Sequence, residues 1–259
     1  MNGSFNVRVV AAEIVSTSEW AARTFPRDIE LAALSQPVHV ELILDLTLAK
    51  IDAWLHRYLN WMPAVAMDNR RLRGCLVAHR GRALIFLEAT ETDEERRFTL
   101  SHELAHFIGH YLAARNLAIA RLGPTIVAVL DGDRPPTAAE RLSGVLARCP
   151  LGIFRDVLGR DGGEPLTAAA ERMEAEADAA AFLAIAPPAE VAAQCANAGR
   201  RLDRAGVLQT LTADFGLACT DAVHHLPVVL RLIRRQAPSL VESLKVAAIA
   251  SGKSHERSI

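Results

Sequence analysis

The stretch His102-Glu103-Leu104-Ala105-His106 decides how this chain is interpreted. On a helix, the two histidines lie one turn apart on the same face, so each imidazole can give one nitrogen to a single tetrahedral zinc ion. Glu103 is rotated about 100° from His102, so its carboxylate can approach a water on that zinc without binding the metal. Zinc lowers the pKa of such a water towards neutrality, which suits Glu103 to general-base catalysis. The stretch therefore predicts a zinc-dependent hydrolase.

The residues around this stretch support a helix. Thr92 and Glu95 form a capping-box pattern, and acidic residues follow Thr92 in the first turn. His110 continues the stripe of histidines one turn beyond His106. It lies too far along the helix axis to share the metal with both other histidines. A contact to the metal ligands, a contact to substrate and a purely structural role remain open for it.

A zinc site of this kind needs a third protein ligand. In one known arrangement a histidine follows six residues after the second one, but here that position is Leu112. In another, a later helix supplies a glutamate. An alanine-rich helix is expected from Thr167 to the pair Pro187-Pro188, which must end it. The acidic residues near its start, which are the candidates, are Glu171, Glu174, Glu176 and Asp178.

The rest of the pattern indicates an α+β chain. The pattern of residues 1–62 predicts mainly helix. Apolar residues alternate with other residues over 38–48, which also fits a strand, but the length of this stretch favours a helix. Apolar runs at 75–77 and 83–87 flank a polar gap with a glycine, which is typical of a hairpin. The strand at 83–88 is a candidate edge for an extended substrate. A second capping box predicts a helix over 137–149. Loops are expected at 131–136 and 161–165.

Composition excludes several classes of protein. Of 259 residues, 51% are hydrophobic and 23% charged, which is typical of globular proteins, and the net charge of −1 gives no field that would attract nucleic acid. The four cysteines form no CxxC pair, which argues against a disulfide framework and a cysteine-based zinc knuckle. The sequence shows neither a signal-peptide pattern nor an apolar run long enough for a membrane helix. We therefore expect a cytoplasmic protein with no membrane partner.

Two blocks of the sequence resemble a known family. Residues 97–106, RFTLSHELAH, followed by His110, are similar to the RFTLAHELGHxxxH block of the ImmA/IrrE-type metallo-endopeptidases. The family's second block, approximately ExEANxFAAxLLMP, is similar to residues 174–187. In that register Glu174 falls on the metal-binding glutamate, and Asp178 replaces an asparagine one turn later, from where it could steady the site.

The sequence departs from the family at several points. Ala105 stands where the family usually has glycine, and Ala184 and Ala186 change the ending of the second block. The 67 residues between His106 and Glu174 are more than the family commonly uses, which indicates an insert at about 120–165. Three roles remain open for this insert: a lid over the site, a surface that binds a partner, or a surface insertion with no function of its own.

The resemblance implies a zincin-like catalytic domain with a small antiparallel sheet and the HExxH helix, flanked by helical segments. We expect a mainly helical segment at 1–62, the catalytic domain at 63–195, a helical segment at 196–250 and a polar tail at 251–259. His102, His106 and Glu174 would hold Zn²⁺, and Glu103 would activate its water. The implied reaction is limited proteolysis of a regulatory protein, such as a helix-turn-helix transcriptional repressor, in a stress or mobile-element context.

The C-terminal segment leaves two other functions open. Residues 211–226 read as helix, tight turn at Gly216 and helix, similar to the helix-turn-helix-like piece that follows the active site in this family. Residues 196–259 carry nine Lys/Arg against five Asp/Glu, with Arg231, Arg234 and Arg235 clustered. This small excess of positive charge allows the segment to contact DNA but does not require it. The alternatives are therefore a DNA-binding regulator and a metal-stabilised regulatory scaffold. Glu103 argues against the scaffold, because a structural zinc site does not need that carboxylate.

Overall fold

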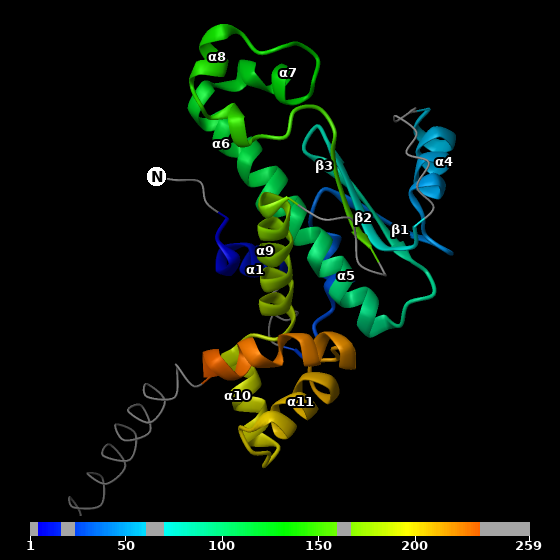
Figure 1. The fold of residues 1–259 in the computed structure, drawn as a ribbon, viewed down its shortest axis with the longest axis vertical. Helices are drawn as coiled ribbons and strands as arrows, with labels where there is room; N and C mark the ends of the chain where they lie inside the picture. The colour runs from blue at the N-terminus through cyan, green and yellow to red at the C-terminus, as the bar shows by residue number, and fades with distance from the viewer. Residues whose placement is uncertain (1–4, 17–23, 61–69, 160–166, 234–259) are drawn as a thin grey trace, which may run out of the picture. The chain divides into compact units, whose positions relative to one another are not determined.

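The structure is a computed structural model that describes residues 5–16, 24–60, 70–159 and 167–233 (Figure 1). Contacts between residues divide the chain into two units, Met1–Ile185 and Ala186–Ile259. The first unit contains the sheet and the HExxH helix, and the described residues of the second form helices. The expected boundary at 62/63, the loop at 161–165, the arginines at 234 and 235 and the tail at 251–259 lie outside the described residues.

A four-stranded mixed sheet forms the centre of the first unit, in the order β1-β3-β2-β4. β2 (Leu72–His79) and β3 (Arg82–Glu88) form the predicted antiparallel hairpin, which is confirmed. Its tight turn places Arg80 and Gly81 at φ values of 53° and 76°. β1 (Val38–Ile43) pairs with β3 in parallel, and β4 (Phe154–Gly159) pairs with β2 in antiparallel orientation. The expected small antiparallel sheet is thus corrected to a mixed one.

Two expectations about strands were wrong. Residues 38–43 form β1 rather than a helix, and the helix α4 (Leu48–Leu59) begins only after the cap residue Thr47. Pairing with β3 satisfies the β1 backbone, which outweighs the helical pattern. The strand at 83–88 cannot receive an extended substrate, because β3 pairs with β1 on one side and β2 on the other. Among the described strands, the sheet edges are β1 and β4.

Helices cover both faces of this sheet (Figure 1). On one face, apolar residues of α4 such as Ile51 and Leu55 form a core with Cys75 and Phe86 of the sheet. On the other face, α5 (Asp93–Ala105) contacts β2 and β3. α9 (Ala168–Ile185) lies alongside α5, and both contact α1 (Val7–Val15). A smaller helix, α3 (Ile29–Ala33), also contacts α5. The HExxH helix is therefore held between the sheet and a helical layer.

The HExxH helix continues without interruption beyond the motif. α5 begins at the predicted capping box of Thr92 and Glu95, which is confirmed, and passes into the π-helix η1 (His106–Leu112) and then α6 (Ala113–Leu122). π-Helical turns are uncommon and occur frequently at functional sites. Within η1, a Cβ on Gly109 would lie 2.0 Å from a ring carbon of Phe5. Glycine is needed there because the N-terminal segment packs directly against the helix.

The expected insert forms a small helical lobe and one strand. Its segments are η2 (Pro124–Ile126), α7 (Val127–Leu130), α8 (Ala138–Leu142), η3 (Leu146–Arg148) and β4. The predicted capping box at the start of α8 is confirmed, but the expected extent to residue 149 was wrong. The helix ends at Leu142 because Gly144 turns the backbone to a φ of 68°. Four apolar residues pack around Ala118 as the core of this lobe.

The second unit begins with α10 (Pro188–Asn197) and α11 (Arg204–Ala213). A turn with Gly216 at a φ of 61° leads into a helix over residues 219–233, so the expected helix-turn-helix order is confirmed. By length and composition, the stretch Ala168–Asn197 could cross a membrane, but 56% of its apolar window is buried inside the protein. Core helices of soluble domains meet the same criteria, and α9 is packed against α5 and α1.

Glu88 fixes the short loop that connects β1 to α4. Glu88 is 1% exposed, and its carboxylate accepts hydrogen bonds from the backbone N–H groups of Asp45 (3.1 Å) and Leu46 (2.7 Å). The backbone N–H and the hydroxyl of Thr90 donate to it as well, each at 3.0 Å. Burial raises the pKa of Glu88, but these hydrogen bonds together lower it below its ordinary value.

Replacing Glu88 with glutamine is expected to lower the free energy of unfolding by about 2 kcal/mol at neutral pH, because a charged acceptor of several hydrogen bonds is lost. Since the folded pKa is depressed, the stabilisation is complete above the unfolded pKa of about 4.3 and is lost as pH falls through the folded value. Urea unfolding at about pH 7 and about pH 3 measures this, and the difference between the parent and the variant should shrink at acid pH. Glu41→Gln, on β1, whose side chain is half-buried and accepts no backbone hydrogen bond among those described, is the control. An equal difference at both pH values contradicts the assignment.

Candidate metal centre

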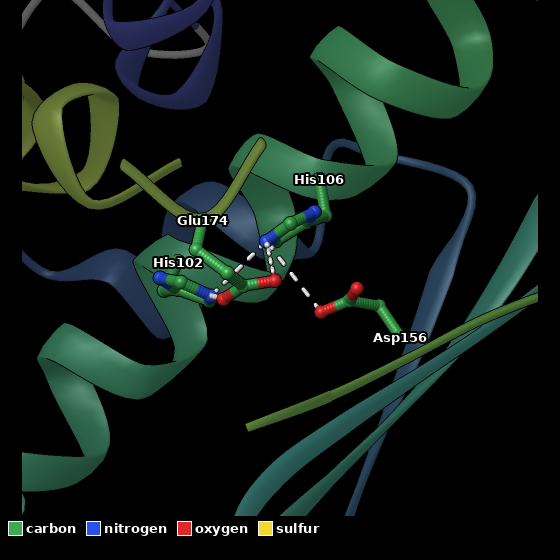
Figure 2. Close-up of side chains that lie close together, drawn as sticks. All are labelled: His102, His106, Asp156 and Glu174. Carbon is green, nitrogen blue, oxygen red and sulfur yellow. Dashed lines mark hydrogen bonds and ion pairs between the residues drawn. The ribbon is translucent and has the colours of Figure 1, made fainter. Parts of the chain in front are cut away.

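Four side chains from three separate parts of the first unit meet at one point (Figure 2). His102 comes from α5, His106 from the start of η1, Glu174 from α9 and Asp156 from β4. One ligand atom from each of them lies within 4.8 Å of all the others. The two histidines are 1% and 0% exposed, so the group lies inside the unit.

The distances within this group suit a small tetrahedral cation. The Nε2 atoms of His102 and His106 are 3.1 Å apart. The two carboxylate oxygens of Glu174 lie 3.3 Å from the His102 Nε2 and 3.6 Å from the His106 Nε2. Asp156 Oδ2 lies 3.5 Å from the same nitrogen of His106. Ligands about 2.0–2.1 Å from zinc in a tetrahedron are roughly 3.3–3.4 Å from one another. The donor atoms and their spacing therefore fit Zn²⁺.

The protonation of the group also indicates a site for positive charge. Burial lowers the pKa of His102, but hydrogen bonds to Asp178 and Glu174 raise it to about 10. Burial raises the pKa of Glu174, but hydrogen bonds from His102 and His106 lower it to about 2. The carboxylates thus stabilise a positive charge on the His102 ring. A cation on its Nε2 would take the place of that proton.

Two residues predicted from the sequence contact this group without joining it. Asp178 Oδ1 lies 2.8 Å from the His102 Nδ1, one helical turn beyond Glu174. His110 Nδ1 lies 3.1 Å from the Nδ1 of His106, and its Nε2 lies 3.3 Å from Glu176 Oε2. Burial, followed by the neighbouring His106, lowers the pKa of His110 to about 3, so its ring is neutral.

These contacts determine which ring nitrogens face the group. A neutral His110 that donates its Nε2–H to Glu176 must accept at Nδ1, so His106 donates its own Nδ1–H there. His102 donates its Nδ1–H to Asp178 in the same way. Each of the two histidines then directs the lone pair of its Nε2 towards the group. The His102 ring is held directly by the carboxylate of Asp178, and the His106 ring is held through His110 by the carboxylate of Glu176.

Glu103 lies beside the group and is buried without a partner. It is 0% exposed, and neither carboxylate oxygen has a hydrogen-bond partner among the described residues. Burial, followed by the charge of Asp156, raises the pKa of Glu103 well above its usual range. An unsatisfied buried carboxylate is costly, and it occurs where a protein binds a water, an ion or a substrate. This arrangement matches the position that a general base needs.

β2 approaches Glu103 so closely that only glycine fits at one position. A Cβ on Gly74 would lie 2.6 Å from Glu103 Oε1 and 2.7 Å from Thr99 Cγ2. Sequence reasoning did not single out Gly74 or Asp156 as site residues. Asp156 lies in a short stretch inside the expected insert and carries no local pattern that marks it. Pairing of β4 with β2, some 80 residues earlier in the chain, brings it to the site.

Comparison with known proteins supports this picture. Residues 59–125 match the family model of peptidase family M78, described as the IrrE N-terminal-like domain. The match includes the hairpin, the HExxH helix and His110, and it ends before Asp156 and Glu174. A comparison with curated proteins gives no match. Together with the candidate metal site, the match confirms the resemblance seen in the sequence: residues 59–125 are similar to the IrrE N-terminal-like domain of the M78 metallopeptidases.

Proposed function

We propose that this protein is a zinc-dependent endopeptidase with a zincin-like catalytic domain, which cleaves a regulatory protein in the cytoplasm. The observation that carries the proposal is the buried carboxylate of Glu103, which has no hydrogen-bond partner and lies beside the donor group. His102, His106 and Glu174 would hold the zinc. Bound there, zinc would act as a Lewis acid and lower the pKa of water.

The residues of the chain have distinct roles in this proposal. Glu103 accepts a proton from the attacking water and can return it to the departing amine. Asp178 and His110 hold the two histidine rings by their Nδ1 atoms, which leaves both Nε2 atoms free to hold the metal when it is bound. Burial of the helix between the sheet and α9 keeps these groups in one geometry, so little reorganisation is needed during the reaction.

The substrate class rests on the family resemblance. It favours limited proteolysis of a helix-turn-helix repressor in a stress response over general protein degradation. Purified protein should contain about one zinc per chain. Extracts of the source cells incubated with the parent should contain new protein N-termini that are absent with Glu103→Gln. Zinc-free protein, or identical N-termini in both samples, would contradict the proposal.

Gly74 provides a separate test of where Glu103 lies. Because a methyl group at this position would meet both Glu103 and Thr99, Gly74→Ala should displace the carboxylate while leaving the donor group in place. A misplacement of about 1 Å can cost roughly 100-fold in rate, so we expect kcat/KM to fall ten- to 100-fold with zinc content unchanged. Gly159→Ala on β4, whose Cβ would meet nothing within 4 Å, is the control. Parental activity in Gly74→Ala would show that Glu103 does not act from this position.

A further inference from the structure

Asp156 gives the metal centre one donor more than the proposed reaction uses. Its Oδ2 lies 3.5 Å from the His106 Nε2, a distance similar to those between Glu174 and the histidines. The same oxygen is buried and has no hydrogen-bond partner among the described residues. The side chain as a whole is 16% exposed. An aspartate oxygen in this position faces the donor group and has no other described role.

The number of protein ligands separates two kinds of zinc site. Catalytic sites keep three protein ligands and leave a position for water, whereas structural sites fill all four positions with protein atoms. Here two nitrogens and two carboxylates all lie within 4.8 Å of one another. We propose that Asp156 is a fourth protein ligand that closes the metal centre, so that the resting enzyme is self-inhibited until Asp156 withdraws. This inference rests on the proposed function and concerns the regulation of the same site.

The pleat of β4 directs Asp156 at the metal centre. Side chains alternate along a strand, so Asp156 points away from the face used by its neighbours Arg155 and Val157. Val157 packs against the core under α4, and Arg155 forms an ion pair of 2.8 Å with Asp52 of that helix. Asp156 therefore projects to the opposite face, where α5 lies.

The position of β4 in the sheet allows Asp156 to withdraw. β4 is an edge strand, and β2 is its pairing partner among the described strands. All its residues are partly exposed rather than fully buried. Movement at an edge strand breaks one ladder and leaves the β1-β3-β2 core intact. Opening the centre thus does not require unfolding of the helix that carries the histidines.

Cobalt substitution tests whether the fourth position is occupied. Full-length parent, Asp156→Asn and Asp156→Ala are loaded with Co²⁺, whose visible absorption reports its ligands, and titrated with acetohydroxamic acid. In the parent, the probe should leave the spectrum unchanged. In both variants it should bind and change the spectrum, at concentrations at least tenfold below the highest one that leaves the parent spectrum unchanged. The affinity for Co²⁺ should also fall in the variants. Gly159→Ala, on the same strand, keeps both the donor and the ion pair of Arg155 with Asp52, so it should behave like the parent.

The outcomes separate this inference from the proposed function. A parent that takes up no Co²⁺ contradicts the proposed metal site itself. A parent whose bound Co²⁺ responds to acetohydroxamic acid as strongly as the Asp156 variants do overturns the fourth ligand and leaves the peptidase proposal standing. Circular dichroism establishes that each variant is folded. The response of the parent alone decides the point even if both variants fail to fold, because an accessible metal in the parent excludes a closed centre.

Discussion

Replacing Glu103 with glutamine is expected to lower kcat by roughly 10²–10⁴-fold, the usual contribution of general acid–base catalysis, while zinc content stays at the parental level. Glutamine keeps the volume and the hydrogen-bonding reach of glutamate and removes its basicity. Glu103 is not among the four residues whose ligand atoms meet, so metal binding should not depend on it. Cleavage of a candidate repressor, with zinc measured by elemental analysis in the same samples, checks both parts of this prediction.

Glu94→Gln is the matched control for this experiment. Glu94 lies on the same helix in its exposed first turn, so its replacement should change neither activity nor zinc content. A Glu103→Gln protein that cleaves at the parental rate would refute the mechanism. If the parent cleaves nothing and Glu103→Gln supports the same regulatory phenotype, the metal-stabilised scaffold becomes the better explanation.

Replacing Glu174 with alanine is expected to release most of the zinc, because two histidines alone rarely hold the ion tightly. Both carboxylate oxygens of Glu174 face the group, at 3.3 Å and 3.6 Å from the two histidine nitrogens. His102→Ala and His106→Ala should have the same effect. Zinc per chain after dialysis against a weak chelator measures the loss.

The other glutamates of α9 provide graded controls. Glu176 contacts His110 rather than the group, so Glu176→Ala should keep the zinc, with an affinity lowered by about tenfold at most through the lost support of His106. Glu171 is exposed, and Glu171→Ala should leave the affinity unchanged. Should Glu176→Ala or Glu171→Ala release the zinc while Glu174→Ala retains it, the ligand assignment is wrong.

The catalytic helix could be predicted from sequence because its determinants are local. The capping box joins residues three apart, and the spacing of His102 and His106 places them on one helical face. The hairpin likewise depends on a short turn with Gly81. Such features depend on residues that are close together in the sequence. The same residues lie within the stretch 59–125 that matches the family model.

The third metal ligand could not be chosen among the acidic residues of α9 from the local sequence pattern alone. The residues alone left four candidates open, and the family resemblance selected Glu174. The structure places Glu174 against both histidines, Asp178 behind His102 and Glu176 against His110. The 3.6-residue period separates these roles once the face that α9 turns towards α5 is known, and packing determines that face.

The sequence by itself determined the HExxH helix, its capping, the hairpin before it and the similarity of residues 59–125 to a metallopeptidase family. Tertiary structure alone decided that residues 38–43 form a strand, that β3 is an interior strand and that Asp156 and Gly74 belong to the site. The physical reason is the range of the interactions. A strand is stabilised by partners far away in the chain, and β2 pairs with β4 across some 80 residues that carry no shared local pattern.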